Sequence, residues 1–270
     1  MDQPPGPIIT LTSDFGPGLF VGLMKGVILS LCPSARLVDL EHGIAAQDVR
    51  AGALALEAAL GVFPAGTVHL AVVDPGVGTS RRGLALKALG QFWVGPDNGL
   101  FTPVWLADPQ TQGWELTEPA YFRQPVSQTF HGRDVFAPVA ARLATGLDPA
   151  RLGPPLTGPV LLDWPRPYAR GPELVGQVLG ADCFGNLLTN LGRAQVEAFL
   201  AGRPALVRLA GLEVRGLSAA YGQAPSGVPL ALFNSQQRLE LALNQGDLRG
   251  HLGLEAAEVY GLEVTVGAGE

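Results

Sequence analysis

The first 150 residues alternate between short apolar runs and longer stretches in which apolar residues recur every three or four positions. The runs predict strands over residues 7–12, 35–40, 67–73, 83–89 and 91–94, and the longer stretches predict helices over residues 20–32, 47–60 and 134–145. Alternating strands and helices are typical of a parallel sheet covered by helices. We therefore expect an N-terminal α/β domain with a mostly parallel central sheet.

The pattern changes near residue 150, where Gly153-Pro154-Pro155 and Trp164-Pro165-Arg166-Pro167 predict a linker. Beyond it, short runs separated by Gly and Asn turns, some alternating as in Leu239-Glu240-Leu241, favour an antiparallel β-barrel-like domain. Its expected strands cover residues 174–179, 205–209, 212–217, 228–233, 238–243 and 258–266, with one helix over 194–200. The predicted domains are therefore residues 1–165 and 166–270.

Composition and charge exclude several classes of protein. With 47% hydrophobic and 16% charged residues, the chain can form a substantial core. A net charge of −6 without a basic run argues against a nucleic-acid partner. No apolar stretch reaches the roughly 20 residues of a membrane span, and the N-terminus lacks a secretion signal, so we expect a cytoplasmic protein without a membrane partner. Cys32 and Cys183 are isolated, which argues against a disulfide framework or a zinc site.

Two aspartates follow two of the predicted strands. Asp14 comes after residues 7–12, and Asp74 comes after residues 67–73. Ligands of open parallel sheets bind beyond the carboxyl ends of the strands, so both carboxylates are expected in one site. A helix cap or turn is the alternative for Asp14. Arg81 lies seven residues after Asp74 and can fold back onto it, either to keep it ionised or only to brace the loop.

His131 is one of four histidines and stands just before a predicted helix. Gly132 leaves the neighbouring backbone open to a ligand, and a position near a helix start favours the neutral imidazole. A purely structural histidine is the alternative. Arg133 and Asp134 are expected to pair or to cap the helix.

The segment after the first strand of the second domain contains Phe184 and Asn186. An aromatic face and an amide that both donates and accepts hydrogen bonds suit an adenine base. An ordinary hairpin turn is the alternative, and the same ambiguity holds for the turns around Ser235 and Asn244.

Six segments together resemble the S-adenosylmethionine (SAM) hydroxide adenosyltransferases, relatives of fluorinase and chlorinase. In chain order they are ITLTSDFG, VVDPGVGTSRR, WVGPDNGLFTPV, TFHGRDVFAPVAA, DCFGNLLTN and NSQQRLELALNQG. The resemblance implies an N-terminal α/β domain, a C-terminal β-barrel and a homotrimer with its sites between subunits. It also implies a catalytic set of Asp74, Arg81 and His131, ribose binding by Asp14 beside Phe15, and contacts to adenine and methionine by Asp182, Phe184, Asn186, Ser235, Glu240 and Asn244.

The activity implied by the resemblance is hydrolysis of SAM to adenosine and L-methionine. Water would attack the ribose C5′ opposite the sulfonium, and because the leaving group is a neutral thioether, neither metal nor cofactor is expected. Halogenating relatives carry Tyr-Ser where this chain has His131-Gly132. Gln236 stands where some relatives have an arginine near the methionine carboxylate. The alternatives are a halide-transferring enzyme and a non-catalytic adenosine-binding module; a Rossmann methyltransferase would need a glycine-rich fingerprint that is missing here.

Overall fold

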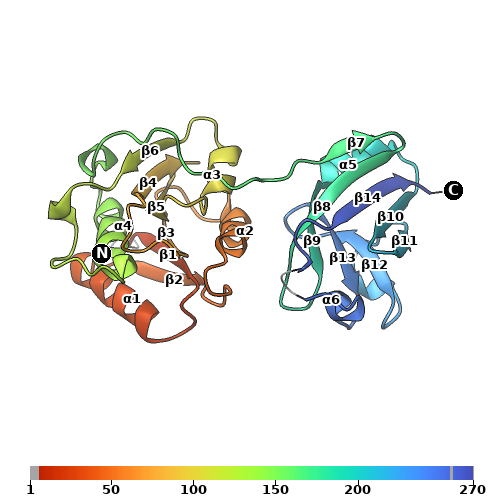
Figure 1. Ribbon diagram of the computed structural model, residues 1–270, viewed down its shortest axis with the longest axis horizontal. Helices are drawn as coiled ribbons and strands as arrows, with labels where there is room; N and C mark the ends of the chain where they lie inside the picture. Colours follow the sequence, from red (N-terminus) through yellow and green to blue (C-terminus); the bar gives the residue numbers. More distant parts are fainter. Residues whose placement is uncertain (1–5, 256–257, 270) are drawn as a thin grey trace, which may run out of the picture. The chain divides into compact units, whose positions relative to one another are not determined.

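The computed structural model describes residues 6–255 and 258–269. Contacts along the chain divide it into two compact units, unit 1 up to Asp163 and unit 2 from Trp164 on (Figure 1). Each unit has its own hydrophobic core. Among the described residues, no helix combines the length and apolar character needed to cross a membrane.

Unit 1 is built on one sheet with the strand order β2-β1-β3-β5-β4-β6. Strands β2, β1, β3 and β5 are parallel, whereas β4 runs antiparallel to both of its neighbours. The mostly parallel sheet is therefore confirmed. The strands are β1 (Ile8–Ser13), β2 (Arg36–Glu41), β3 (Val68–Val72), β4 (Gly83–Ala88), β5 (Gln91–Pro96) and β6 (Gln112–Glu115).

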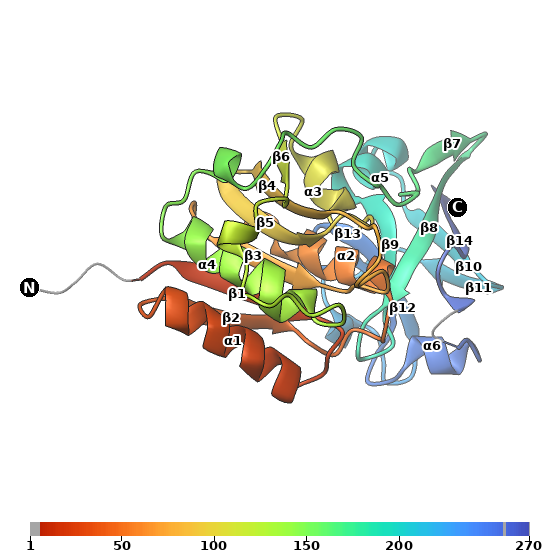
Figure 2. The same ribbon diagram turned by 60° about the vertical axis from the view of Figure 1, so that its left-hand side comes forward.

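Helices cover both faces of this sheet (Figures 1 and 2). Because side chains alternate across a strand, Leu70 and Val72 of β3 enter one core, while Ala71 and the residue just after the strand, Val73, enter the other. The first core is shared with α1 and α4, and the second with α2 and α3. The helices are α1 (Leu19–Leu31), α2 (Val49–Ala59), α3 (Thr102–Ala107) and α4 (Ala137–Ala144).

The strands of unit 2 are antiparallel throughout and nearly close into a barrel, as predicted for the C-terminal domain. Its strand order is β11-β10-β14-β8-β9-β13-β12, with β7 on the other side of β8. The strands are β7 (Tyr168–Arg170), β8 (Glu173–Ala181), β9 (Leu187–Gly192), β10 (Ala205–Leu209), β11 (Leu212–Arg215), β12 (Pro229–Phe233), β13 (Arg238–Leu243) and β14 (Glu263–Ala268), and the helices are α5 (Arg193–Leu200) and α6 (Leu248–His251).

Several local predictions differ from the structure. Gly153-Pro154-Pro155 is not part of a linker but runs along β6, since the Pro154 carbonyl accepts the Glu115 N–H at 2.9 Å. The predicted helix over residues 134–145 starts earlier, as a π-helical turn (Gly132–Phe136), and becomes α-helical only at Ala137. The last strand begins at Glu263 rather than at residue 258. Both cysteines are free, as predicted.

Three strands and two short helices were not predicted. They are β6, β7, β9, α3 and α6. Each spans at most six residues, so the helices have fewer than two turns and the strands offer few repeats of a periodic pattern. The conformation of such short strands depends mainly on their neighbouring strands.

Candidate functional site

Arg81 folds back onto Asp74 in the loop between β3 and β4. Its Nε lies 3.0 Å from Asp74 Oδ1, and its Nη2 lies 2.5 Å from Asp74 Oδ2. The two side chains are only 9% and 5% exposed. This two-point pairing fixes the plane of the carboxylate, and it is stronger than a pair of neutral hydrogen bonds.

His131 completes the group from 50 residues further along the chain. Its Nδ1 lies 3.1 Å from Arg81 Nη2. Because a guanidinium only donates hydrogen bonds, Nδ1 must accept, and the proton of the neutral ring is then on Nε2. The structure therefore brings together Asp74, Arg81 and His131, the three residues that the sequence singled out as a catalytic set.

Burial shifts the protonation of this group. Burial raises the pKa of Asp74, and the charge and hydrogen bonds of Arg81 offset part of that rise. Burial, followed by the positive charge of Arg81, lowers the pKa of His131. At neutral pH the histidine is therefore uncharged, and Asp74 is a stronger base than an exposed aspartate.

A cavity of about 370 Å³ opens beside Arg81 and His131. The remainder of its wall is mainly apolar and comes from the segment that leads into α4. Its other lining residues are Gly83, Leu116, Pro119, Phe122, Gln124, Val126 and Val135. The space can hold water against two hydrogen-bond donors while apolar walls limit solvation elsewhere.

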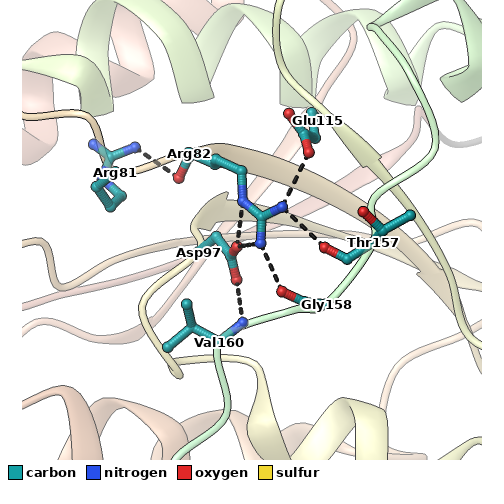
Figure 3. Close-up of polar contacts among 7 residues, drawn as sticks. All are labelled: Arg81, Arg82, Asp97, Glu115, Thr157, Gly158 and Val160. Atoms are coloured by element: carbon teal, nitrogen blue, oxygen red, sulfur yellow. Dashed lines mark hydrogen bonds and ion pairs between the residues drawn. The ribbon is translucent and has the colours of Figure 1, made fainter.

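Arg82 holds the loop that presents Arg81 (Figure 3). Its carbonyl accepts a hydrogen bond from Arg81 Nη1 at 3.0 Å. Its guanidinium binds Asp97, Glu115 and the carbonyls of Thr157 and Gly158, all at 3.0 Å or less. Asp97 in turn accepts the Val160 N–H at 2.9 Å. Arg82 is thus committed to structural contacts, which leaves Arg81 as the arginine of the site.

Asp14 lies at the same edge of the sheet as Asp74. Ser13 of β1 pairs with Val72 of β3, so the segments that follow these two strands emerge side by side. Asp14 does not cap α1, whose N-cap is Gly18. One carboxylate oxygen, Oδ2, accepts the Gln47 N–H at 2.8 Å.

Phe15 belongs to an aromatic cluster that reaches the residue before His131. The centroid of its ring lies 5.7 Å from that of Phe20 and 5.8 Å from that of Phe130. Phe20 and Phe130 were not among the predicted site residues, because their role depends on packing between α1 and a distant loop.

In unit 2, the segment from Asp182 to Asn186 is the turn between β8 and β9. Asp182 accepts hydrogen bonds from the backbone N–H groups of Phe184 and Asn186 and from the Asn186 side chain, each at 2.9 Å. The local hairpin-turn interpretation therefore describes the backbone. The Phe184 ring is 71% exposed, so its face is available for stacking.

Glu240 is only 2% exposed and anchors a second polar group of unit 2. It accepts hydrogen bonds from the Tyr221 hydroxyl at 2.6 Å and from Asn234 Nδ2 at 3.1 Å. Burial raises the pKa of Tyr221, and Glu240 and Asp182 raise it further, which places Asp182 in the same electrostatic neighbourhood. No local sequence signal marks Tyr221.

Ser235 and Asn244 lie at opposite ends of β13. Ser235 is exposed in the turn that precedes the strand, where Asn234 makes the hydrogen bonds. Asn244 follows the strand and donates to the Ala224 carbonyl at 2.6 Å. Three of the predicted residues of unit 2 are therefore distributed along β13 and its ends, namely Ser235, Glu240 and Asn244, and the other three lie in the turn between β8 and β9.

Within residues 6–255 and 258–269, no group of three His, Cys, Asp or Glu side chains is arranged to hold a metal ion.

Comparisons with known proteins agree with this arrangement. A (R)-S-adenosyl-L-methionine hydrolase of Thermus thermophilus is 45% identical over 90% of this chain and 94% of its own length. A solved structure of an uncharacterized conserved protein from Thermotoga maritima superimposes with a TM-score of 0.88 at 34% identity, covering 96% of this chain and 99% of that one. A fluorinase of Actinoplanes is more distant, at 30% identity over 96% of this chain and 97% of its own length.

Residues 9–153 match the family model of the SAM hydroxide adenosyltransferase N-terminal domain, and residues 176–264 match that of the C-terminal domain. These two segments include Asp14, Asp74, Arg81 and His131 in unit 1 and the Asp182 turn and Glu240 in unit 2. The chain therefore belongs to the SAM hydroxide adenosyltransferase family.

Proposed function

We propose that this protein hydrolyses SAM to adenosine and L-methionine. The observation that carries the proposal is the contact of Asp74, Arg81 and His131 beside a cavity large enough for water. The hydrolase name of the Thermus thermophilus relative supports the same activity.

The proposed step is a single displacement at the ribose C5′. The oxygen of a water molecule forms a bond to C5′ as the C5′–S bond breaks. The electron pair of the broken C5′–S bond remains on sulfur, which leaves as the neutral thioether of methionine. The water loses one proton, so the site must supply an acceptor. Holding water and C5′ in line is worth on the order of 7–11 kcal/mol in well-oriented systems.

We propose Asp74 as the proton acceptor, and the hydrogen bonds of the site support that choice. His131 accepts from Arg81 at Nδ1 and carries its proton on Nε2, so in this arrangement neither ring nitrogen takes a proton from water. The Asp74 carboxylate accepts from Arg81 at both oxygens and from the Gly76 backbone N–H, and with about four acceptor sites in total it retains at least one for the proton of a water molecule. His131 Nε2–H would orient the water, and Arg81 would stabilise its developing negative charge.

We assign substrate binding to side chains of both units. Asp14 would accept hydrogen bonds from the ribose hydroxyls, with Phe15 packed beside it. The exposed ring of Phe184 would stack on adenine, supported by Asp182 and Asn186. Further contacts to adenine and methionine are proposed for Ser235, Glu240 and Asn244.

Halide transfer is the competing activity, favoured by the similarity to fluorinase. His131-Gly132 occupies the position where halogenating relatives carry Tyr-Ser, and the imidazole is tied to Arg81. Incubation with SAM and excess chloride is therefore expected to yield adenosine and no 5′-chloro-5′-deoxyadenosine.

The direct test is chromatography of the products formed from SAM by the purified protein in H₂¹⁸O, with and without a chelator. Attack by water on C5′ predicts equal amounts of adenosine and methionine, with ¹⁸O in the 5′-hydroxyl and no effect of the chelator. Methylthioadenosine as product, or adenosine without the label, would refute the proposed reaction. Binding of adenosine without turnover would instead support a non-catalytic module.

We also propose a preference for the (R) configuration at sulfur, after the name of the hydrolase relative. Comparing rates on the separated (R) and (S) epimers tests it, and equal rates would contradict it.

A further inference from the structure

The loop that carries Asp14 is held on both sides by one histidine, His42. The Ser13 hydroxyl oxygen lies 2.7 Å from His42 Nδ1, and the Gly16 N–H donates to the His42 carbonyl at 2.9 Å. Both contacts form because β1 and β2 are parallel neighbours whose ends, Ser13 and Glu41, lie at the same edge of the sheet. Asp14 is thus enclosed between two positions that His42 restrains.

A chain of hydrogen bonds continues from His42 to the surface. His42 Nε2 lies 3.0 Å from Asp39 Oδ1, and Asp39 Oδ2 accepts from Lys25 Nζ at 2.6 Å. Against the effect of burial, Lys25 and His42 lower the pKa of Asp39, so this carboxylate is ionised and only accepts.

The direction of each hydrogen bond follows from that acceptor. His42 donates Nε2–H to Asp39, so in the neutral ring Nδ1 accepts from the Ser13 hydroxyl. The Ser13 oxygen then accepts the Phe15 N–H at 3.4 Å. The chain from Lys25 to Phe15 therefore orients the backbone on both sides of Asp14.

Ser13, His42 and Asp39 are hydrogen-bonded in the same order as the catalytic triad of a serine hydrolase. The burial of Ser13 excludes a role as a nucleophile. Ser13 is completely buried at the end of β1. Its oxygen cannot reach an external substrate, and a nucleophile has to be exposed at the site. Among the side chains assigned to substrate binding, Asp14 directly follows Ser13 and lies between Ser13 and Gly16, the two residues that contact His42.

We propose that His42, with Ser13, Asp39 and Lys25, is a positioning relay that holds the Asp14 carboxylate in register with the ribose 2′- and 3′-hydroxyls. Gln47 N–H fixes one oxygen of that carboxylate, and His42 fixes the backbone that carries it. The inference rests on the proposed function, because it requires Asp14 to bind ribose.

Two nucleosides separate positioning from general stability. Calorimetry would measure the binding of adenosine and of 2′,3′-dideoxyadenosine, which lacks the hydroxyls that Asp14 would bind. Hydrogen bonds to a charged group are worth about 1.5–3 kcal/mol, so the wild type should prefer adenosine by about 10- to 100-fold. His42→Gln and Ser13→Ala should reduce this preference about tenfold, with little change in dideoxyadenosine binding. Ser13→Thr, which keeps the hydroxyl, should retain the preference.

The two lysines of the chain provide a matched pair of controls. Lys25→Met should weaken the preference for adenosine, whereas Lys87→Met, on the exposed side of β4, should leave it unchanged. In an Asp14→Ala background, His42→Gln should have no further effect on the preference.

Each outcome has a distinct meaning. A wild type that does not distinguish the two nucleosides contradicts ribose binding by Asp14, and with it the proposed function. If the wild type prefers adenosine and the His42→Gln and Ser13→Ala variants show the same preference, the relay is overturned and ribose binding by Asp14 is not. Equal weakening of both nucleosides also overturns it, because that result indicates a general structural role.

Discussion

Arg81 is placed by two contacts of different range. The seven-residue loop brings its guanidinium back to Asp74, a contact that the spacing alone made predictable. The contact with His131 Nδ1 spans 50 residues and depends on how the start of the π-helical turn packs against the sheet. The composition of the triad could thus be proposed from sequence, but the tautomer of His131 required the fold.

Replacing Asp74 by asparagine or His131 by alanine should abolish most turnover. Loss of a general base or of the group that orients the water lowers kcat by about 10²- to 10⁴-fold. Adenosine binding should change only a few-fold, because neither side chain is assigned to the nucleoside. Product chromatography and calorimetry measure the two effects, and His251→Ala in α6 is the control. A variant with wild-type kcat would remove its residue from the mechanism.

His69 is predicted to make stability depend on pH. It is fully buried, bonds Thr10 and Gln91, and stacks on Trp93 at 3.9 Å. Burial lowers its pKa from 6.5 to about 4. Between these values the unfolded chain binds a proton that the folded chain does not, so stability falls as pH decreases from 6.5 to about 4.

The expected loss is about 3 kcal/mol, at 1.36 kcal/mol per pKa unit. Urea unfolding of the wild type and of His69→Gln at several pH values measures it. Carboxylates titrate in both proteins, so the comparison isolates His69. Equal slopes of stability against pH in the two proteins would contradict the assignment.

At the scale of elements, Arg82 joins β4, β5, β6 and the segment 157–160 (Figure 3). The segment 157–160 is distant in sequence from β4 and β5, and Asp97, at 1% side-chain exposure, forms an ion pair with Arg82. The pairing was not predictable, because β6 was too short to recognise and the antiparallel insertion of β4 reorders the sheet.

Arg82→Met should therefore destabilise unit 1. Removing one partner of a buried ion pair costs about 3–5 kcal/mol, and because the Arg82 side chain is 30% exposed, we expect about 2 kcal/mol. Adding Asp97→Asn should recover part of that loss. Arg208→Met, which breaks exposed pairs in unit 2, should cost less than about 1 kcal/mol. Equal effects of the two arginine variants in thermal unfolding would refute the difference in burial as the cause.

At the scale of the whole molecule, we propose a homotrimer whose sites combine residues of neighbouring subunits. Sedimentation equilibrium should give three times the 28.2 kDa mass of one chain. A single-chain mass would contradict the trimer.

Mixing subunits tests whether the sites are shared. A His131→Ala subunit is inactive but has an intact Phe184, whereas a Phe184→Ala subunit should have a raised KM and an intact His131. Co-refolded mixtures should contain sites with wild-type KM only if one subunit provides Phe184 to its neighbour. A mixture with only the raised KM would place each site within one chain.

The sequence by itself determined the two fold classes, the edge of the sheet where Asp14 and Asp74 lie, and the pairing of Arg81 with Asp74. These features depend on periodicity, on strand direction and on short loops, all of which are local. Only the tertiary structure decided the contact of His131 with Arg81, the burial of Glu240 against Tyr221, and the connection from Lys25 through His42 to Ser13. Those contacts depend on sheet register and on packing between distant segments, which no local pattern encodes.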